Sequence, residues 1–311
     1  MKRMIALLLC AATLLMFAAC GSSETPAPTD APAPVTEAPA ETAAPTAAPT
    51  ETVPAPTAPQ ALLENAVLFD SDDATFTVTK AENSDHLGMQ LHVQCVNKGS
   101  RALLFSWDMV SVCGYMYDPF WAVEVAAGKT SNSTIDLDTY ALEMMGVESV
   151  DEITFTLRIS DSANWTEAPI AEEVHTIYPT GLTADTLVLP GHPARDTQVV
   201  IAEDENIRFA IEQVYDEASA YTLQVYMENK TDRNLMYSWD LVSVNGNMID
   251  PFWAASVTAG KRACEKITFY RSDLEANGIT DVSSIEFKLI VSDYDDWEAP
   301  NLLEQVYTYT P

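Results

Sequence analysis

Basic side chains are scarce in this sequence of 311 residues, which has 16 Lys and Arg against 46 Asp and Glu and a net charge of −30 at pH 7. Such an excess repels phosphate backbones and anionic lipid headgroups, which excludes nucleic acid and these headgroups as binding partners. Glycine is also rare, and neither a Gly-rich phosphate loop nor a Gly-x-Ser-x-Gly elbow occurs. The 47% hydrophobic content still suffices for packed cores, and the length suggests about two domains.

Histidine and cysteine, the usual ligands of zinc, are few and poorly spaced for that use. The four histidines have no HxxxH-like spacing and no Cys-x-x-Cys occurs, so we expect no metal site and no cofactor. Cys95 lies among alternating apolar residues, which predicts a small core residue. A Cys95–Cys113 disulfide is the open alternative.

The first twenty residues have the pattern of an export signal. A basic start, Met1–Arg3, precedes an apolar run from Met4 to Phe17, which is shorter than the about 20 residues needed to span a bilayer. The run ends in Phe-Ala-Ala-Cys-Gly, which resembles the lipobox of bacterial lipoproteins. The resemblance implies that Cys20 is diacylglycerated and becomes the new N-terminus. The protein would then be exported and held on the outer face of the cell membrane. An ordinary signal peptide, with Cys20 incidental, is the alternative.

Residues 21–60 form a Pro-rich linker. They contain ten of the 18 prolines, many Ala and Thr, and only Val35 and Val53 as larger aliphatic residues. Such a segment cannot bury enough surface to offset its chain entropy, so we expect it to be disordered and extended. Its forty residues could reach on the order of 120 Å, which suits a spacer between membrane and folded domains.

The rest of the chain contains an internal duplication. A shift of 132 residues makes 23 of the 39 positions between 91 and 129 identical to their counterparts. Upstream, one residue of slippage aligns Phe76 with Ile207. This duplication predicts two homologous domains, repeat 1 at 62–181 and repeat 2 at 187–311, joined by the short segment 182–195.

Both repeats have the pattern of β-sheet. Apolar residues alternate with polar ones at 89–95 and again at 221–227, and β-branched runs occupy 153–159 and 285–291. Asn245-Gly246 between apolar segments predicts a type I′ hairpin. Residues 272–278 suggest one helical turn with Ser272 as its cap. We therefore predict an all-β fold, two tandem immunoglobulin-like β-sandwich domains.

The repeated strings also support a family resemblance. Ser-Trp-Asp-x-Val-Ser-Val-x-Gly, followed by Asp-Pro-Phe-Trp-Ala and Ala-Gly-Lys, is similar to Ig-like repeats of Gram-positive surface lipoproteins. The resemblance covers about residues 62–311. It implies a β-sandwich at the cell surface and supplies no catalytic residue that could be carried over.

The six tryptophans, three in each repeat, are the main patterned signal for a ligand. Two of them stand in strand-like runs, where we expect core positions: Trp107 and Trp239. Trp165 and Trp297 instead lie in acidic loops that begin at Asp161 and Asp293. Aromatic rings can stack on sugars and carboxylates can accept hydroxyl hydrogens, so these four residues are the candidate ligand contacts. The acidic loops could alternatively hold Ca²⁺ or be solvated turns.

These observations favour a lipid-anchored extracellular protein that is not an enzyme and that acts as a binding or structural module. The first alternative is a glycan-binding surface module. Two others are solute capture for a transporter, which the absence of long helical patterns disfavours, and a carboxylate-dependent hydrolase. The partner is the membrane, through the acyl anchor, together with an unidentified protein or glycan.

Overall fold

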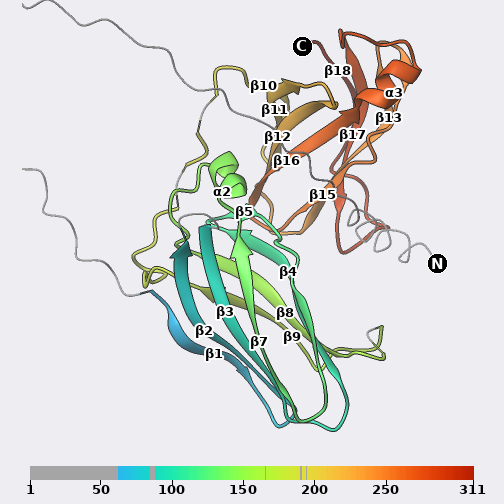
Figure 1. The fold of residues 1–311 in the computed structure, drawn as a ribbon. Coiled ribbons are helices and arrows are strands. Elements are labelled where there is room, and N and C mark those ends of the chain that lie inside the picture. The colour runs from blue at the N-terminus through green and yellow to red at the C-terminus, as the bar shows by residue number, and fades with distance from the viewer. Residues whose placement is uncertain (1–61, 85–87, 165, 190, 194) are drawn as a thin grey trace, which may run out of the picture. The chain divides into compact units, whose positions relative to one another are not determined.

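The computed structural model describes residues 62–84, 88–164, 166–189, 191–193 and 195–311 (Figure 1). The export signal with Cys20, the Pro-rich linker and Trp165 therefore lie outside the described residues. Across the described ranges, no helix has the length and apolar character needed to cross a membrane.

The regular secondary structure of the described chain is β-strand apart from two short helices, and the strands fall into two sets that follow the duplication in the sequence. Repeat 1 contains β1 (Glu64–Asp70), β2 (Ala74–Ser84), β3 (Gly88–Asn97), β4 (Leu103–Val112), β5 (Tyr115–Met116), β6 (Ala122–Val125), β7 (Thr130–Leu137), β8 (Ile153–Asp161) and β9 (Ala171–Ile177). Repeat 2 contains β10 (Val199–Glu203), β11 (Ile207–Asp216), β12 (Ala220–Asn229), β13 (Leu235–Val244), β14 (Asn247–Met248), β15 (Ala254–Val257), β16 (Arg262–Tyr270), β17 (Ile285–Asp293) and β18 (Leu303–Tyr309). Two short helices follow the corresponding strands β7 and β16: α2 (Thr139–Met145) and α3 (Arg271–Ala276).

The strand pairing is that of an immunoglobulin-like sandwich. In repeat 1, one sheet has the order β1-β2-β3-β7, while β4 pairs with β8 and β8 with β9 in the other layer. The β3–β7 and β4–β8 pairs correspond to the B–E and C–F pairs of that fold. Repeat 2 repeats the arrangement with β10-β11-β12-β16 and β14-β13-β17-β18. The predicted all-β sandwich fold is confirmed.

The two repeats share a strand pairing as well as a linker. The two-residue strand β5 of repeat 1 lies parallel to the start of β16, with Tyr115 beside Arg262 and Met116 beside Ala263. Met116 packs into the core of repeat 2, and Tyr226 of β12 packs into the core of repeat 1. Both repeats belong to one compact unit.

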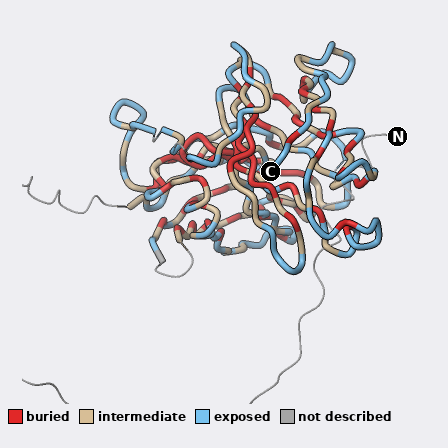
Figure 2. The backbone as a smooth tube through the Cα atoms, turned by 90° about the horizontal axis from the view of Figure 1, so that it is seen from above, coloured by how far each residue is buried: buried red, intermediate tan, exposed pale blue. Residues whose placement is uncertain are grey.

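The cores are built from the inward faces of the two layers. Buried residues gather in the interior, and exposed residues gather in the loops at the periphery (Figure 2). Trp107 on β4 and Trp239 on β13 are both 5% exposed, as predicted, and a buried tryptophan on this strand is typical of immunoglobulin domains. Cys95 is fully buried and is a free thiol, so the alternative disulfide with Cys113 does not form.

One detail of the predicted repeat alignment is wrong. Phe76 lies opposite Cys95 on β3, and Phe209 lies opposite Met227 on β12. Since Cys95 and Met227 are counterparts, Phe76 corresponds to Phe209 and not to Ile207. The connection between β2 and β3 is one residue longer than that between β11 and β12, so the upstream offset grows to 133.

Local turn chemistry explains the other outcomes. Asn245 and Gly246 have φ values of 51° and 82°, as a type I′ hairpin requires, and that prediction is confirmed. The predicted cap Ser272 is wrong, because α3 begins at Arg271 after Tyr270. Helix α2 was not predicted, although Asp138 caps it by accepting the Ala141 N–H.

Candidate functional site

The outward face of the β1-β2-β3-β7 sheet carries the candidate site. Successive side chains of a strand point to opposite faces, so β3 buries Met89, Leu91 and Val93 and turns the intervening residues outward. Strand β7 likewise turns its polar residues outward. Together with polar residues of β2 they line an open pocket of about 370 Å³. We call this surface the polar face of repeat 1.

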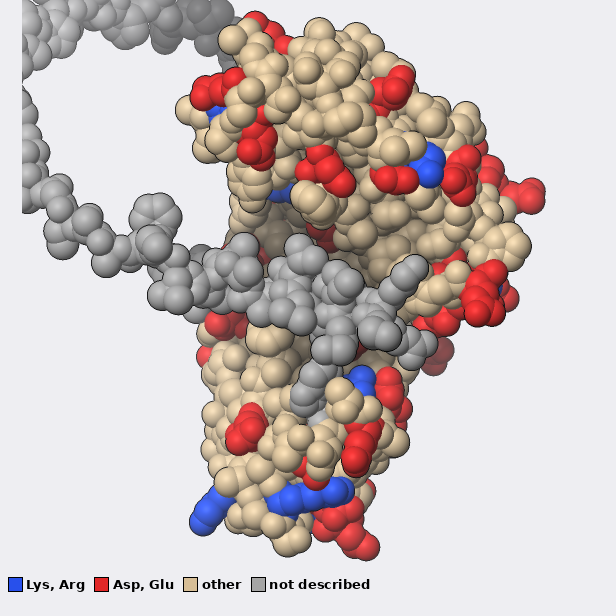
Figure 3. Space-filling model, turned by 90° about the vertical axis from the view of Figure 1, so that its right-hand side faces the viewer, with Lys and Arg blue, Asp and Glu red and all other residues tan. Residues whose placement is uncertain are grey.

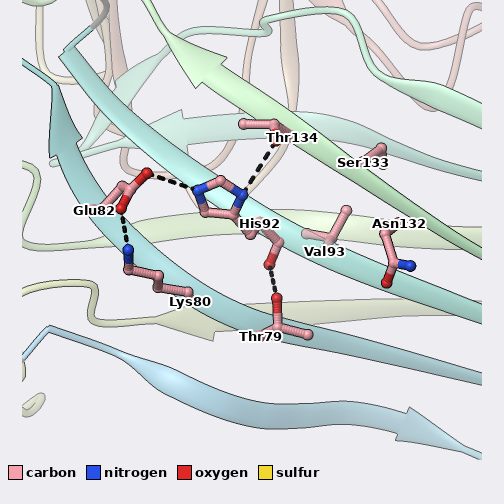
Figure 4. Close-up of a pocket in the computed structure, with 8 residues that line it drawn as sticks. All are labelled: Thr79, Lys80, Glu82, His92, Val93, Asn132, Ser133 and Thr134. Atoms are coloured by element: carbon pink, nitrogen blue, oxygen red, sulfur yellow. Dashed lines mark hydrogen bonds and ion pairs between the residues drawn. The ribbon is translucent and has the colours of Figure 1, made fainter.

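His92 is the centre of this polar face (Figure 4). Its Nε2 lies 3.0 Å from Glu82 Oε1 and its Nδ1 lies 3.2 Å from Thr134 Oγ1. The same Glu82 carboxylate pairs with the Lys80 ammonium. Below the ring, Thr79 Oγ1 donates to the carbonyl oxygen of His92 at 3.1 Å. The imidazole is therefore held on both sides and cannot turn freely.

Amide side chains extend the array along β3. Gln90 Nε2 donates to Asp136 Oδ1 at 2.6 Å, and Gln94 Nε2 donates to Asn132 Oδ1 at 3.0 Å. Each bond joins a residue of β3 to the residue opposite it on β7. The donors and acceptors of this face are thus pre-arranged in a row before any ligand arrives.

The charge of the polar face is largely balanced. Hydrogen bonds from Lys80 and then from His92 hold the pKa of the Glu82 carboxyl below its usual value. The carboxylate therefore stays ionised at neutral pH and offsets the ammonium beside it. Apart from the Asp136 carboxylate, which accepts from the neutral amide of Gln90, the surface offers many hydrogen-bonding groups without a strong local charge.

The sequence of hydroxyl, imidazole and carboxylate in Thr134, His92 and Glu82 follows the order of a nucleophilic triad. Such a triad also needs donors that converge on the developing oxyanion. The cationic side chain that lines the pocket is Lys80, and its ammonium already pairs with Glu82. The row is therefore a polar array in which the Lys80 ammonium is already paired with a carboxylate.

The corresponding face of repeat 2 is buried. Strand pairing places Gln224 where repeat 1 has His92, and Tyr226 where it has Gln94. The β-bulge residue Thr79 corresponds to Glu212. Gln224, Tyr226 and Glu212 are at most 4% exposed.

The linker between the repeats covers that second face. The His192 ring stacks on Tyr226, with ring centroids 3.8 Å apart, and pairs with the Glu212 carboxylate. Arg195 Nε lies 3.3 Å from Glu212 Oε2. From repeat 1, the Tyr115 hydroxyl lies 2.8 Å from His192 Nδ1. One face is thus sealed by the chain itself, while its counterpart in repeat 1 is open.

The candidate ligand contacts predicted from the sequence lie elsewhere. Asp161 pairs with Arg101, and its counterpart Asp293 pairs with Arg233, at 3.0 and 3.3 Å. Both carboxylates also accept backbone N–H groups of their own turn. They therefore order the loop. Trp297 is 67% exposed, as expected for a loop residue, and its role as a ligand contact stays a prediction.

Across the described ranges, no group of three or more His, Cys, Asp or Glu side chains is placed to hold a metal ion. The polar face itself was not predicted as a site. Its signal in the sequence is the alternation of Gln90, His92 and Gln94 with apolar residues, which indicates a strand with one solvent-exposed polar face. This alternation does not show that β7 adds hydrogen-bonding partners to that face.

A scan of the chain against protein-family models finds no match, and a search of curated proteins finds none. Among solved structures, the chain is similar over 72% of its length to a β-D-mannosidase from Dictyoglomus thermophilum, with 12% identity and a TM-score of 0.23. It is similar over 74% of its length to the exo-chitosanase CsxA from Amycolatopsis orientalis, with 11% identity and a TM-score of 0.21. The chain spans 22% and 26% of the lengths of these two proteins. Likeness at this level carries no argument about function.

Proposed function

We propose that the protein is an exported, lipid-anchored binding module of the cell surface, without enzymatic activity, and that it binds a neutral glycan through the polar face of repeat 1. The contrast between the two repeats carries this proposal. The same sheet face is sealed by linker and tyrosine side chains in repeat 2 and is open and lined with ordered polar groups in repeat 1.

The chemistry of the polar face supports a polyhydroxylated ligand. Sugar hydroxyls both donate and accept hydrogen bonds, and they match amide, imidazole and hydroxyl groups that do the same. Asn132, Gln94 and Thr134 form a row of such groups along neighbouring strands. The pairing of Lys80 with Glu82 lowers the cost of desolvating these two ions when a ligand binds.

Titration of an array of neutral oligosaccharides tests this proposal. We expect His92→Ala and Asn132→Ala each to weaken binding by about 5- to 10-fold, since each removes hydrogen bonds of about 1 kcal/mol apiece. The matched control is Thr154→Ala, because Thr154 and Thr176 form a similar exposed cross-strand pair on the other sheet, at 3.1 Å.

Two results would count against the proposal. If no neutral oligosaccharide binds, or if the control weakens binding as much as the two variants do, the polar face is not a glycan site. Hydrolysis of a p-nitrophenyl ester by the protein, abolished in Thr134→Ala, would show that the hydroxyl–imidazole–carboxylate row is catalytic and would overturn the non-enzymatic assignment.

The anchor is tested separately. We expect the full-length protein to incorporate a labelled fatty acid in a bacterial host and Cys20→Ala to lose that label completely, because the thiol is the acylated group. Cys10→Ala is the matched control, since Cys10 lies inside the apolar run of the export signal. A Cys20→Ala protein that still carries the label would contradict the assignment.

A further inference from the structure

Each repeat places one phenylalanine almost wholly in solvent. Phe120 is 91% exposed and Phe252 is 83% exposed, and both stand in the same string Asp-Pro-Phe-Trp-Ala. A ring this exposed adds little to the core. The ring is retained in both copies, although 16 of the 39 aligned positions between 91 and 129 differ, and its exposure in both copies fits a role outside folding. We call residues 118–121 and 250–253 the Phe loops.

Hydrogen bonds hold each Phe loop in place. Trp107 Nε1 donates to the carbonyl oxygen of Pro119 at 3.2 Å. In repeat 2, Asp250 Oδ1 accepts the backbone N–H of Phe252 at 2.8 Å. Phe252 has a φ of 50°, a left-handed conformation that the surrounding contacts must maintain. Because the backbone that presents the ring is already ordered, a partner loses little entropy in fixing it.

Carboxylates accompany each Phe loop. Partial burial of its carboxyl group, and then the charge of Asp108, raise the pKa of Asp118 to about 6. The counterpart of Asp108 in repeat 2 is Asp240, whose Oδ2 lies 3.1 Å from Lys288 Nζ. Strand pairing puts Thr156 beside Asp108, where Lys288 stands beside Asp240. Asp240 is thus paired with a lysine of its own chain, whereas Asp108 forms no ion pair with any Lys or Arg of the described residues.

We propose that the Phe loops are docking surfaces for a basic polypeptide segment, whose Lys or Arg side chains lie against Phe120 and Phe252 and beside the neighbouring carboxylates. The negative face of the ring and the carboxylate attract the same cation. The pairing of Lys288 with Asp240 is an internal example of the carboxylate part of this contact. The loop of repeat 1 is the stronger surface, because Asp108 and Asp118 have no internal cation to displace among the described residues.

Charge complementarity selects a basic partner over a neutral or acidic one. The chain has a net charge of −30, and acidic groups outnumber basic ones on the face seen in Figure 3. A field of one sign accelerates the approach of a cationic partner and repels an anionic one. A basic segment also relieves the repulsion between the two carboxylates of repeat 1, which a sugar ring would leave in place.

The proposal is tested by the binding of a short peptide of alternating Lys and Gly to the full-length protein. Salt at about 0.15 M screens long-range charge. We expect Phe120→Ala to weaken binding by about 3- to 5-fold, Phe252→Ala by less, and the double variant by about 10-fold. Each ring is exposed, so circular dichroism should show folded variants. A control peptide of alternating Glu and Gly, of the same length, should not bind.

The matched control is Val174→Ala with Val306→Ala. These two valines are also counterparts in the repeat and are 71% and 54% exposed, but they lie on strands, where a β-branched residue is expected. The proposal is overturned if the double phenylalanine variant binds the Lys-Gly peptide as the wild type does, since attraction would then be net charge alone. It is overturned too if the phenylalanine variants lose binding to a neutral oligosaccharide instead.

Discussion

Replacing Glu212 by Ala is expected to lower the free energy of unfolding by about 3 kcal/mol. The Glu212 side chain is fully buried, and His192, Arg195 and Gln224 all direct polar atoms at its carboxylate. Removing the carboxylate leaves a guanidinium and an imidazole partly buried without their counter-charge. The loss of a partner inside a buried ion cluster is among the costliest single changes in a protein.

The same carboxylate predicts how stability depends on pH. Burial alone would raise the pKa of Glu212, but its hydrogen bond with His192 and the charges of His192 and Arg195 together hold that pKa below the usual value. A group whose pKa is lowered by folding stabilises the protein above its unfolded pKa. This contribution is lost as the pH falls through the lower folded pKa. Wild type and Glu212→Gln should therefore converge in stability under strongly acidic conditions.

Urea denaturation of the full-length protein, at neutral and at acidic pH, measures both the cost of Glu212→Ala and the dependence of stability on pH. The matched control is Thr79→Ala, because Thr79 occupies the equivalent bulge of repeat 1 and lies in the open polar face. We expect that change to cost less than about 1 kcal/mol. If Glu212→Ala unfolds at the same urea concentration as the wild type, the carboxylate does not hold the linker and the sealed face of repeat 2 needs another explanation.

The strands could be predicted from the sequence because their physical signal is local. A period of two in apolar residues, with the Asn245-Gly246 turn, is enough to place β12, β13 and β14. The duplication then predicts a second sandwich, because two similar sequences adopt the same fold. Even the error in aligning Phe76 is local, because the one residue of slippage was taken in the wrong direction: the extra residue lies between β2 and β3 of repeat 1.

The sealed face of repeat 2 could not be predicted in this way. Glu212 sits at a β-bulge, which inserts a residue between Ile211 and Gln213 in the pairing with β12 and breaks the alternation of faces. The linker was predicted as a short joint. In the structure, His192 of this linker stacks on Tyr226. This contact joins residues that are distant in the sequence, and neither composition nor periodicity predicts it. Only the comparison of the sealed face of repeat 2 with the open face of repeat 1 distinguishes the latter as a candidate site.

A second large effect is expected for a pair of asparagines that the duplication retains. Asn97 and Asn229 are both 1% exposed. Asn229 Nδ2 donates to the carbonyl oxygens of Arg233 and Val257, at 2.7 and 2.8 Å, and its Oδ1 accepts a backbone N–H. Asn97 makes the same three bonds in repeat 1. Each side chain therefore satisfies buried backbone groups at the turn where the chain crosses from one layer of the sandwich to the other.

Asn229→Ala should lower the free energy of unfolding by about 3 kcal/mol, since it leaves two carbonyl groups and one N–H without their partner in a buried position. Asn97→Ala should cost a similar amount, because the geometry is the same. Urea denaturation measures both changes, with Asn301→Ala as the control, since Asn301 is exposed and makes a single side-chain bond to Glu304. A loss below about 1 kcal/mol for both buried asparagines would mean that water enters the turn and replaces the amide. Their retention in both copies would then need a reason other than stability.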